Sequence, residues 1–298
     1  MEYHNPVSLK ETVDGLNIRP DGVYVDVTFG GGGHSREIMS RLGENGKLFA
    51  FDQDLDALNN AIDDERFTLI NENFRFIKRF LRFHGIKQVD GILADLGVSS
   101  HQFDVAERGF STRFDAELDM RMNQKGDISA YHVVNEYDEQ DIARVLFDYG
   151  ELKNARAMAN VIVTARKDKE IRNSDELKKV LAKFLPGHKS NKILAQIYQA
   201  IRIEVNQEMD VLKEFLEQSL EILKPGGRLS VISYHSLEDR LVKRFVKNGM
   251  FEGEPERDFF GNFEVPFKTI EKLIVPSEEE IAINNRARSA KLRVAEKI

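Results

Sequence analysis

Four consecutive glycines, Gly30 to Gly33, follow a short β-rich run and precede a helical pattern. Glycine at such a junction lets the backbone approach a ligand closely and adopt positive φ angles. The start of the helix behind the loop offers free N–H groups and a partial positive charge. We therefore interpret this loop as the binding site of a nucleotide-like cofactor.

The loop is compatible with two cofactors. Gly30 and Gly32 fit the dinucleotide fingerprint G-x-G-x-x-G/A, whereas the third position holds Ser35. The alternative is a methyltransferase loop, in which an acid precedes spaced glycines, as Asp26 does here. Both cofactors call for an acid at the end of the second strand that grips ribose hydroxyls, and Asp52 stands there.

A further acid favours methyl transfer. Asp95 ends an apolar run at 89–94, so in a doubly wound sheet it faces the same crevice as the glycine loop. In amino-methyltransferases, an acid or amide here faces both the methyl donor and the attacking nitrogen. We predict that Asp95 is the catalytic residue, a hydrogen-bond acceptor for an exocyclic amine. The carbonyls of Leu96 and Gly97 are alternative acceptors.

The composition excludes several other chemistries. The 298 residues include no cysteine, which rules out disulfides, thiolate metal sites and a cysteine nucleophile. The histidines lack metal-ligand spacing, so we expect no metal. The net charge of −7 argues against indiscriminate nucleic-acid binding. Without a long apolar run or a secretory signal at the N-terminus, we expect a cytoplasmic protein with no membrane partner.

Strand-like runs alternate with helical patterns around these residues, which predicts βαβ units and a parallel sheet. The runs lie at 23–27, 47–51, 67–70, 89–94 and 228–234. Two later runs, 267–275 and 290–295, predict an antiparallel hairpin at a sheet edge. From about residue 104 the strand signal gives way to helical patterns, at 138–149, 154–166 and 174–184.

The helical stretch separates its charges into two halves. Residues 104–151 contain 5 basic and 12 acidic residues, whereas 152–205 contain 12 basic and 5 acidic residues. We predict that 104–205 is an inserted helical subdomain that recognises substrate. The remaining 1–103 and 206–298 are then one discontinuous α/β domain.

Six motifs, in order along the chain, carry a resemblance to a known family. They are Asp26-Val-Thr-Phe-Gly-Gly-Gly-Gly-His-Ser35, Asp95-Leu-Gly-Val-Ser-Ser100, Glu107-Arg-Gly-Phe-Ser111, Leu118-Asp-Met-Arg-Met122, Ser236-Leu-Glu-Asp-Arg240 and Asn285-Arg-Ala-Arg-Ser289. Over essentially its whole length, the chain resembles the bacterial small-subunit ribosomal RNA (cytosine-N4) methyltransferases of the H family. The resemblance implies a class I S-adenosylmethionine-dependent methyltransferase, a Rossmann-like doubly wound sheet with an inserted helical subdomain. It also implies S-adenosylmethionine as cofactor and a decoding-region cytidine of 16S ribosomal RNA as target, with the RNA met within the small ribosomal subunit.

The resemblance also implies a set of cofactor contacts. Position by position, they fall on Gly32, Gly33, His34, Asp52, Phe74, Asp95 and Gln102. By its pattern alone, Phe74 is a core aromatic, and only the resemblance makes it a cover for the adenine. Residues 114–120 depart from the family's Asp-Gly-Pro-Leu-Asp-Met, which leaves the conformation of this substrate loop open.

The residues also bear on how a target base is held. The aromatic expected three residues after Asp95 is replaced by Val98, so another ring must stack on the base. The candidates are Tyr234 and His235, followed by Phe103 and Phe110. Phosphate contacts are expected from the basic half of the insertion, from the basic helix face at 240–247 or from the tail at 286–298.

Two other functions compete with this hypothesis. The first is a nicotinamide-dependent oxidoreductase, which rests on Gly30, Gly32 and Asp52. The second is a non-enzymatic RNA-binding assembly factor with a vestigial cofactor fold. Among methyltransferases, the absence of cysteine favours cytosine N4 over carbon-5 as the target, because carbon-5 methylation normally requires a cysteine adduct.

Overall fold

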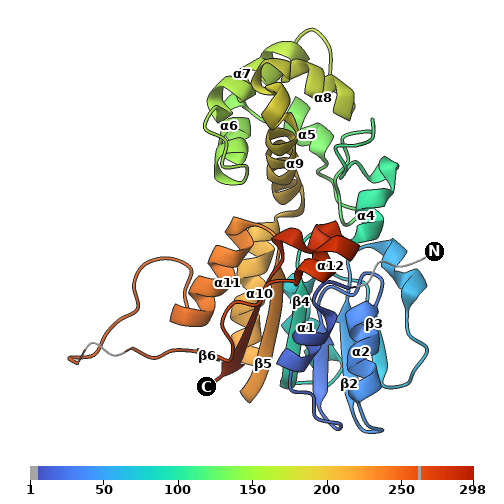
Figure 1. Cartoon of the computed structure of the whole chain (residues 1–298), viewed down its shortest axis with the longest axis vertical. Helices are drawn as coiled ribbons and strands as arrows, with labels where there is room; N and C mark the ends of the chain where they lie inside the picture. Colours follow the sequence, from blue (N-terminus) through green and yellow to red (C-terminus); the bar gives the residue numbers. More distant parts are fainter. Residues whose placement is uncertain (1–5, 261–262) are drawn as a thin grey trace. The chain divides into compact units, whose positions relative to one another are not determined.

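The computed structural model describes residues 6–260 and 263–298, which form two compact units (Figure 1). The first unit combines Met1–Gly97 with Met209–Ile298, and the second is Val98–Glu208. Within the described ranges, no helix is long and apolar enough to cross a membrane.

A seven-stranded sheet in the order β3-β2-β1-β4-β5-β7-β6 is the framework of the first unit. The strands are β1 (Val23–Asp26), β2 (Lys47–Phe51), β3 (Phe67–Ile70), β4 (Val89–Asp95), β5 (Leu223–Ser233), β6 (Phe267–Thr269) and β7 (Lys291–Lys297). Neighbours among β1 to β5 are parallel, and β7 runs antiparallel to both β5 and β6. The expected parallel sheet and edge hairpin are confirmed, although β6 is shorter than the run at 267–275.

Alternating side chains let helices cover both faces of this sheet. Tyr24, Leu48 and Leu93 pack with α1 (Leu9–Gly15) and α2 (Gly33–Arg41) on one face. The residues next to them in sequence, including Val25, Phe49 and Ile92, pack on the opposite face. The helices there are α3 (Ile77–Phe83), α10 (Glu208–Ile222) and α11 (Ser236–Asn248). The unit is therefore a doubly wound α/β fold.

The order of the strands places the candidate site. The chain leaves β1 toward β2 and β3, then returns across β1 to form β4 on its other side. The sheet therefore has its topological switch point between β1 and β4, and ligands of such sheets bind outside the carboxyl ends of the strands at this point. Asp26 is the last residue of β1 and Asp95 the last residue of β4.

The second unit is helical with a hydrophobic core of its own. Its helices are α4 (Ser100–Asp104), α5 (Ala130–Asn135), α6 (Glu139–Asp148), α7 (Ala155–Arg166), α8 (Ser174–Val180) and α9 (Ser190–Asn206). All of residues 98–208 are described, and their only β pairing is an isolated bridge between Glu117 and Asn173. Helices α6, α7 and α8 correspond to sequence patterns, whereas the 17-residue α9 was not predicted.

Short helices complete the connections in both units. They are η1 (Leu55–Asn60), η2 (Phe74–Phe76), η3 (Ala106–Arg108), η4 (Ala182–Phe184), η5 (Gly187–Lys189), α12 (Glu278–Ile283) and η6 (Asn285–Ser289). The loop whose sequence departs from the family pattern is tightly held. Met120 is buried with a φ of 60°, and the Asn206 side chain bonds its carbonyl and the Met122 amide.

The packing between β1 and β4 predicts the effect of one substitution. A Cβ on Gly91 would lie 2.9 Å from ring atoms of Tyr24, and that ring is held by a 2.7 Å bond from Arg19 N to its hydroxyl. Gly91→Ala should therefore lower the free energy of unfolding by about 1–3 kcal/mol, measured by urea denaturation. The control is Gly187→Ala, where a Cβ meets nothing within 4 Å. Equal unfolding midpoints for the two variants would contradict this packing.

Candidate active site

The glycine loop connects β1 to α2 in a backbone conformation that requires glycine. Gly30 and Gly32 have φ angles of 51° and 76°, in the left-handed region. Gly33 is needed for space, because a Cβ there would lie 2.1 Å from Pro6 Cγ. The loop is thus a fixed structure and not merely a flexible turn.

Asp26 shapes the inner side of the loop. Its carboxylate is fully buried and accepts hydrogen bonds from Ser35 Oγ at 2.7 Å and Thr28 N at 3.1 Å. Burial raises the pKa of Asp26, while His34 and these hydrogen bonds act in the opposite direction. The acid that precedes the glycines therefore holds the loop in shape.

Asp52 follows β2 and ties the loop to that strand. One carboxylate oxygen accepts the N–H of Gly30 at 2.8 Å, and the other accepts the N–H of Asp54 at 2.9 Å. Burial raises the pKa of Asp52 to about 6, and the two backbone bonds lower it. The side chain is only partly covered, so each oxygen keeps acceptor capacity for the hydroxyls of a ligand. Asp54 itself is buried and caps η1 through Asp56 N.

Asp95, at the end of β4, is hydrogen-bonded through its N–H and its Oδ1 and faces His34 with its Oδ2. Its N–H donates to Thr28 Oγ1 at 2.7 Å, and its Oδ1 accepts the hydroxyl of Tyr234 at 2.7 Å. Its Oδ2 lies 3.8 Å from Nδ1 of His34. Burial raises the pKa of Asp95 to about 6, although His34 and Tyr234 favour the charged form. The side chain keeps 23% of its surface accessible, enough to meet a substrate.

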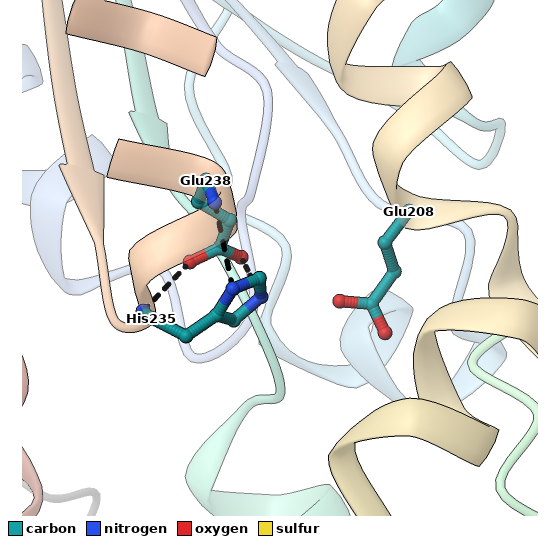
Figure 2. A group of neighbouring side chains, drawn as sticks. All are labelled: Glu208, His235 and Glu238. Carbon is teal, nitrogen blue, oxygen red and sulfur yellow. Dashed lines mark hydrogen bonds and ion pairs between the residues drawn. The ribbon is translucent and has the colours of Figure 1, made fainter. Parts of the chain in front are cut away.

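Tyr234 and His235, the first candidates for base stacking, have other contacts in this structure. The Tyr234 hydroxyl is bonded to Asp95, and His235 forms the N-cap of α11. Figure 2 shows the Glu238 carboxylate turned back toward this cap, beside the ring of His235. Glu238 accepts the N–H of Tyr234 at 2.8 Å, which fixes the backbone behind the tyrosine. The residue that stacks on the base stays a prediction.

Several of these contacts were not foreseen from the sequence. Thr28, Ser35 and Glu238 hold the acids or the residues next to them, yet pattern analysis gave them no such role. Glu238 carried one usable signal, since an acid three residues after a helix N-cap is the capping-box arrangement. The tyrosine–aspartate bond joins residues 139 positions apart, and no local pattern reveals such a pair.

The remaining predicted contacts divide between the two units. Phe74, in η2, packs edge-on against Phe215 with ring centroids 5.3 Å apart, so its core role is real, and part of it stays accessible. Gln102 lies in the second unit, 5% exposed, where its side chain and Ser99 form a capping box. Phe103 and Phe110 also belong to the second unit, and Phe110 is buried in its core.

The charges of the site favour a cationic ligand. Asp26, Asp52 and Asp95 stand at the ends of three neighbouring strands, β1, β2 and β4. A pyrophosphate would be repelled by these carboxylates, and the N–H of Gly30 is already bound by Asp52. A sulfonium attached to a ribose fits this group of acids. The carboxylates attract the positive charge of the sulfonium, and Asp52 can accept hydrogen bonds from the ribose hydroxyls.

Comparisons with known proteins cover the entire chain. The model of the MraW methylase family matches residues 1–298. A Flavobacterium johnsoniae protein named "Ribosomal RNA small subunit methyltransferase H" is 82% identical over 298 residues, covering 100% of this chain and 99% of that protein. A Bacteroides thetaiotaomicron protein of the same name is 57% identical over 298 residues, covering 100% and 98%. A solved structure titled putative rRNA-methylase from Clostridium thermocellum aligns with 98% of each chain at 15% identity and a TM-score of 0.45.

The geometry of Asp52 predicts how binding of S-adenosylmethionine depends on pH. We expect ribose hydroxyls to donate to the ionised carboxylate, whose pKa is raised by burial to about 6. The affinity should therefore fall roughly tenfold between pH 8 and pH 5, as the carboxylate takes up its proton. Asp52→Ala should weaken binding about ten- to a hundredfold at pH 7.5 and reduce the pH dependence, both measured by calorimetry.

Asp54→Ala is the matched control, because Asp54 caps η1 and its backbone N–H, which Asp52 accepts, survives the substitution. We expect its affinity to stay within about threefold of the parent protein. A folded Asp52→Ala protein with unchanged affinity would remove Asp52 from the cofactor site.

Proposed function

The chain belongs to the MraW methylase family, and we propose that its first unit binds S-adenosylmethionine and methylates the N4 amine of a cytidine in the decoding region of 16S ribosomal RNA. The family and its relatives show that the protein is an S-adenosylmethionine-dependent small-subunit rRNA methyltransferase with the class I fold. The nicotinamide oxidoreductase is thereby excluded. The decoding region, the residue roles and the second unit's role belong to the proposal.

One observation supports Asp95 as the residue that meets the reacting amine. Asp95 presents a partly accessible carboxyl at the switch point of the sheet, with Oδ1 oriented by Tyr234. An exocyclic amine of cytosine is a weak nucleophile because its lone pair is delocalised into the ring. A fixed acceptor on one of its N–H groups draws the nitrogen toward tetrahedral geometry and receives the proton that becomes acidic.

The other residues of the first unit bind and orient. When bound, S-adenosylmethionine supplies an electrophilic methyl group on a cationic sulfonium. Asp52 accepts ribose hydroxyls, and the backbone at Gly32, Gly33 and His34 lies where the loop meets α2. Phe74 supplies an apolar surface beside Phe215 for the adenine. The reaction then depends mainly on alignment of donor and amine, which this fixed loop provides.

We assign the second unit to RNA recognition, with Gln102 at its start as the proposed cofactor contact. Its basic half exposes Lys179, Lys189 and Lys192, whereas Lys178 pairs with Asp175 at 3.2 Å. The C-terminal tail is a weaker candidate for binding phosphates, because Lys291 and Arg293 are both bound by Asp239. We propose the assembled small subunit, in the cytoplasm, as the form in which the RNA is met.

The position of the methyl group tests the proposed reaction directly. Small-subunit RNA from cells that lack the enzyme should gain N4-methylcytidine when incubated with the protein and S-adenosylmethionine. Carbon-5 attack lacks the cysteine adduct that it normally needs, because the chain has no cysteine. Nuclease digestion and chromatography separate the two methylcytidine isomers.

A methyl group on carbon-5 would overturn the mechanism, and no methylation at all would favour the assembly factor. Running the reaction on naked 16S RNA and on the assembled subunit tests the proposed substrate form. Mapping the modified cytidine by mass spectrometry of RNA fragments tests the decoding-region assignment.

The basic surface of the second unit can be tested separately from the chemistry. Replacing Lys179, Lys189 and Lys192 by Gln should weaken RNA binding and lower the salt slope of log Kd by up to about two to three, since each lost phosphate contact releases about one counterion fewer. Affinity for S-adenosylmethionine should stay unchanged. The control exchanges three exposed lysines of the first unit, Lys47, Lys87 and Lys268, for Gln. Equal RNA affinity and salt slope in both variants would make the second-unit lysines a solvated face.

A further inference from the structure

His34 is buried beside Asp95, and its ring orientation is fixed by a second partner. Only 5% of the residue is exposed. Its Nε2 lies 3.1 Å from the carbonyl oxygen of Val7, which can only accept a hydrogen bond. Nε2 therefore carries a hydrogen, and in the neutral ring Nδ1 carries an unprotonated lone pair. That lone pair faces Oδ2 of Asp95, 3.8 Å away.

The surroundings make this nitrogen a suitable proton acceptor. Two carboxylates, Asp26 and Asp95, interact electrostatically with His34, and both would stabilise a positive charge on its ring. Asp95 is in turn faced by Tyr234, which donates to it, and by the charges of Asp26 and Glu238. Because Tyr234 occupies Oδ1, the second oxygen of Asp95 is the one directed at His34.

We propose that His34 takes over, through Asp95, the proton that the cytidine N4 amine loses during methyl transfer. This inference rests on the function proposed above, and it gives His34 a role beyond contact with the cofactor. Since His34 acts through Asp95, it is a positioning residue with a proton-holding function. Tyr234 is a positioning residue of a second kind, which holds Asp95 by its other oxygen.

The proton and electron pairs balance along this route. The N4 lone pair forms the new bond to the methyl carbon while the carbon–sulfur bond breaks and leaves its pair on sulfur. The amine, now positively charged, passes one proton to Oδ2 of Asp95. Asp95 hands that proton to Nδ1 of His34 and is again a carboxylate. The proton is released to solvent when the products leave, so no further reactant is consumed.

The distance of 3.8 Å requires a small movement before the second transfer. Proton transfer needs a donor–acceptor separation of about 2.6–3.2 Å, and catalytic contacts often tighten only in the substrate complex. The accessible side chain of Asp95 can turn toward His34, whereas His34 is held by Val7. Movement of Asp95 therefore closes the gap, and Tyr234 limits how far it turns.

His34→Gln is the informative variant because it separates the two ends of the ring. A glutamine Nε2 lies the same number of bonds from Cβ as the histidine Nε2, so it can still donate to the Val7 carbonyl. The basic Nδ1 is lost. We expect the single-turnover methylation rate at saturating cofactor and RNA to fall by at least about tenfold at pH 8, with the dissociation constant for S-adenosylmethionine within about threefold of the parent.

Tyr234→Phe is the matched variant on the other oxygen of Asp95. It removes a donor that favours the carboxylate, so the acid side of the rate–pH profile should move up by about one pH unit. The two variants thus differ in their profiles, which a common structural defect would not produce.

A second measurement needs no turnover. In the protein without cofactor at pH 8, ¹⁵N NMR of the imidazole should show Nε2 protonated and Nδ1 unprotonated for the resonance that His34→Gln removes. A proton on Nδ1 instead would overturn the proposal. So would a His34→Gln protein that binds cofactor normally and reacts at the parent's rate at pH 8. A parent protein that makes no N4-methylcytidine would reject the proposed function, whereas these two results reject only the role of His34.

Discussion

The structure depends on three carboxylates, those of Asp26, Asp52 and Asp95, which stand at the ends of neighbouring strands. Burial raises the pKa of Asp52 and of Asp95 to about 6, above the usual 3.8. A folded-state pKa above the unfolded value means that the folded state binds the proton more tightly. The free energy of unfolding therefore falls as the pH rises from about 4 to 6 and stays lower above that. For Asp95 this amounts to roughly 2–3 kcal/mol, at about 1.4 kcal/mol per pKa unit.

The contacts that build the site also offset part of this loss in the free energy of unfolding. Asp52 accepts two backbone N–H groups, one of them from the glycine loop. Asp26 accepts hydrogen bonds from Thr28 N, just after β1, and from Ser35 Oγ, in the first turn of α2. These bonds stabilise the ionised acids and also determine the conformation of the loop. The acids that we propose as ligand groups are thus also structural groups, and changing one of them is expected to disturb the loop around it. For that reason the control at Asp54 keeps the backbone contacts of the loop intact.

The sequence predicted the features that depend on local pattern and on the geometry of parallel strands, namely the strands of the sheet and the acids at their ends. Runs ending at Asp52 and Asp95 were enough to place both acids at one edge of the sheet. Helix α9 was missed because its ends carry weak signals: Lys189 precedes it without a side-chain cap, and Gln207 ends it in the left-handed conformation usually taken by glycine. The pairs Tyr234–Asp95 and Asp239–Arg293 were also missed, since they join residues brought together only by the order of the strands.

The acidity of the crevice has a consequence for the end of the reaction. In the proposed reaction, methyl transfer removes the positive charge from sulfur and places it on the amine, so the acids that attract a sulfonium also attract the proton that the amine sheds. With a pKa near 6, Asp95 accepts that proton readily at neutral pH, yet it must be ionised again before it can serve another amine. A basic nitrogen directed at its second oxygen, in a ring that Val7 holds in one tautomer, meets this requirement. A cationic methyl donor and an acid that aligns the methyl-accepting amine therefore account for the placement of Asp95 between Tyr234 and His34.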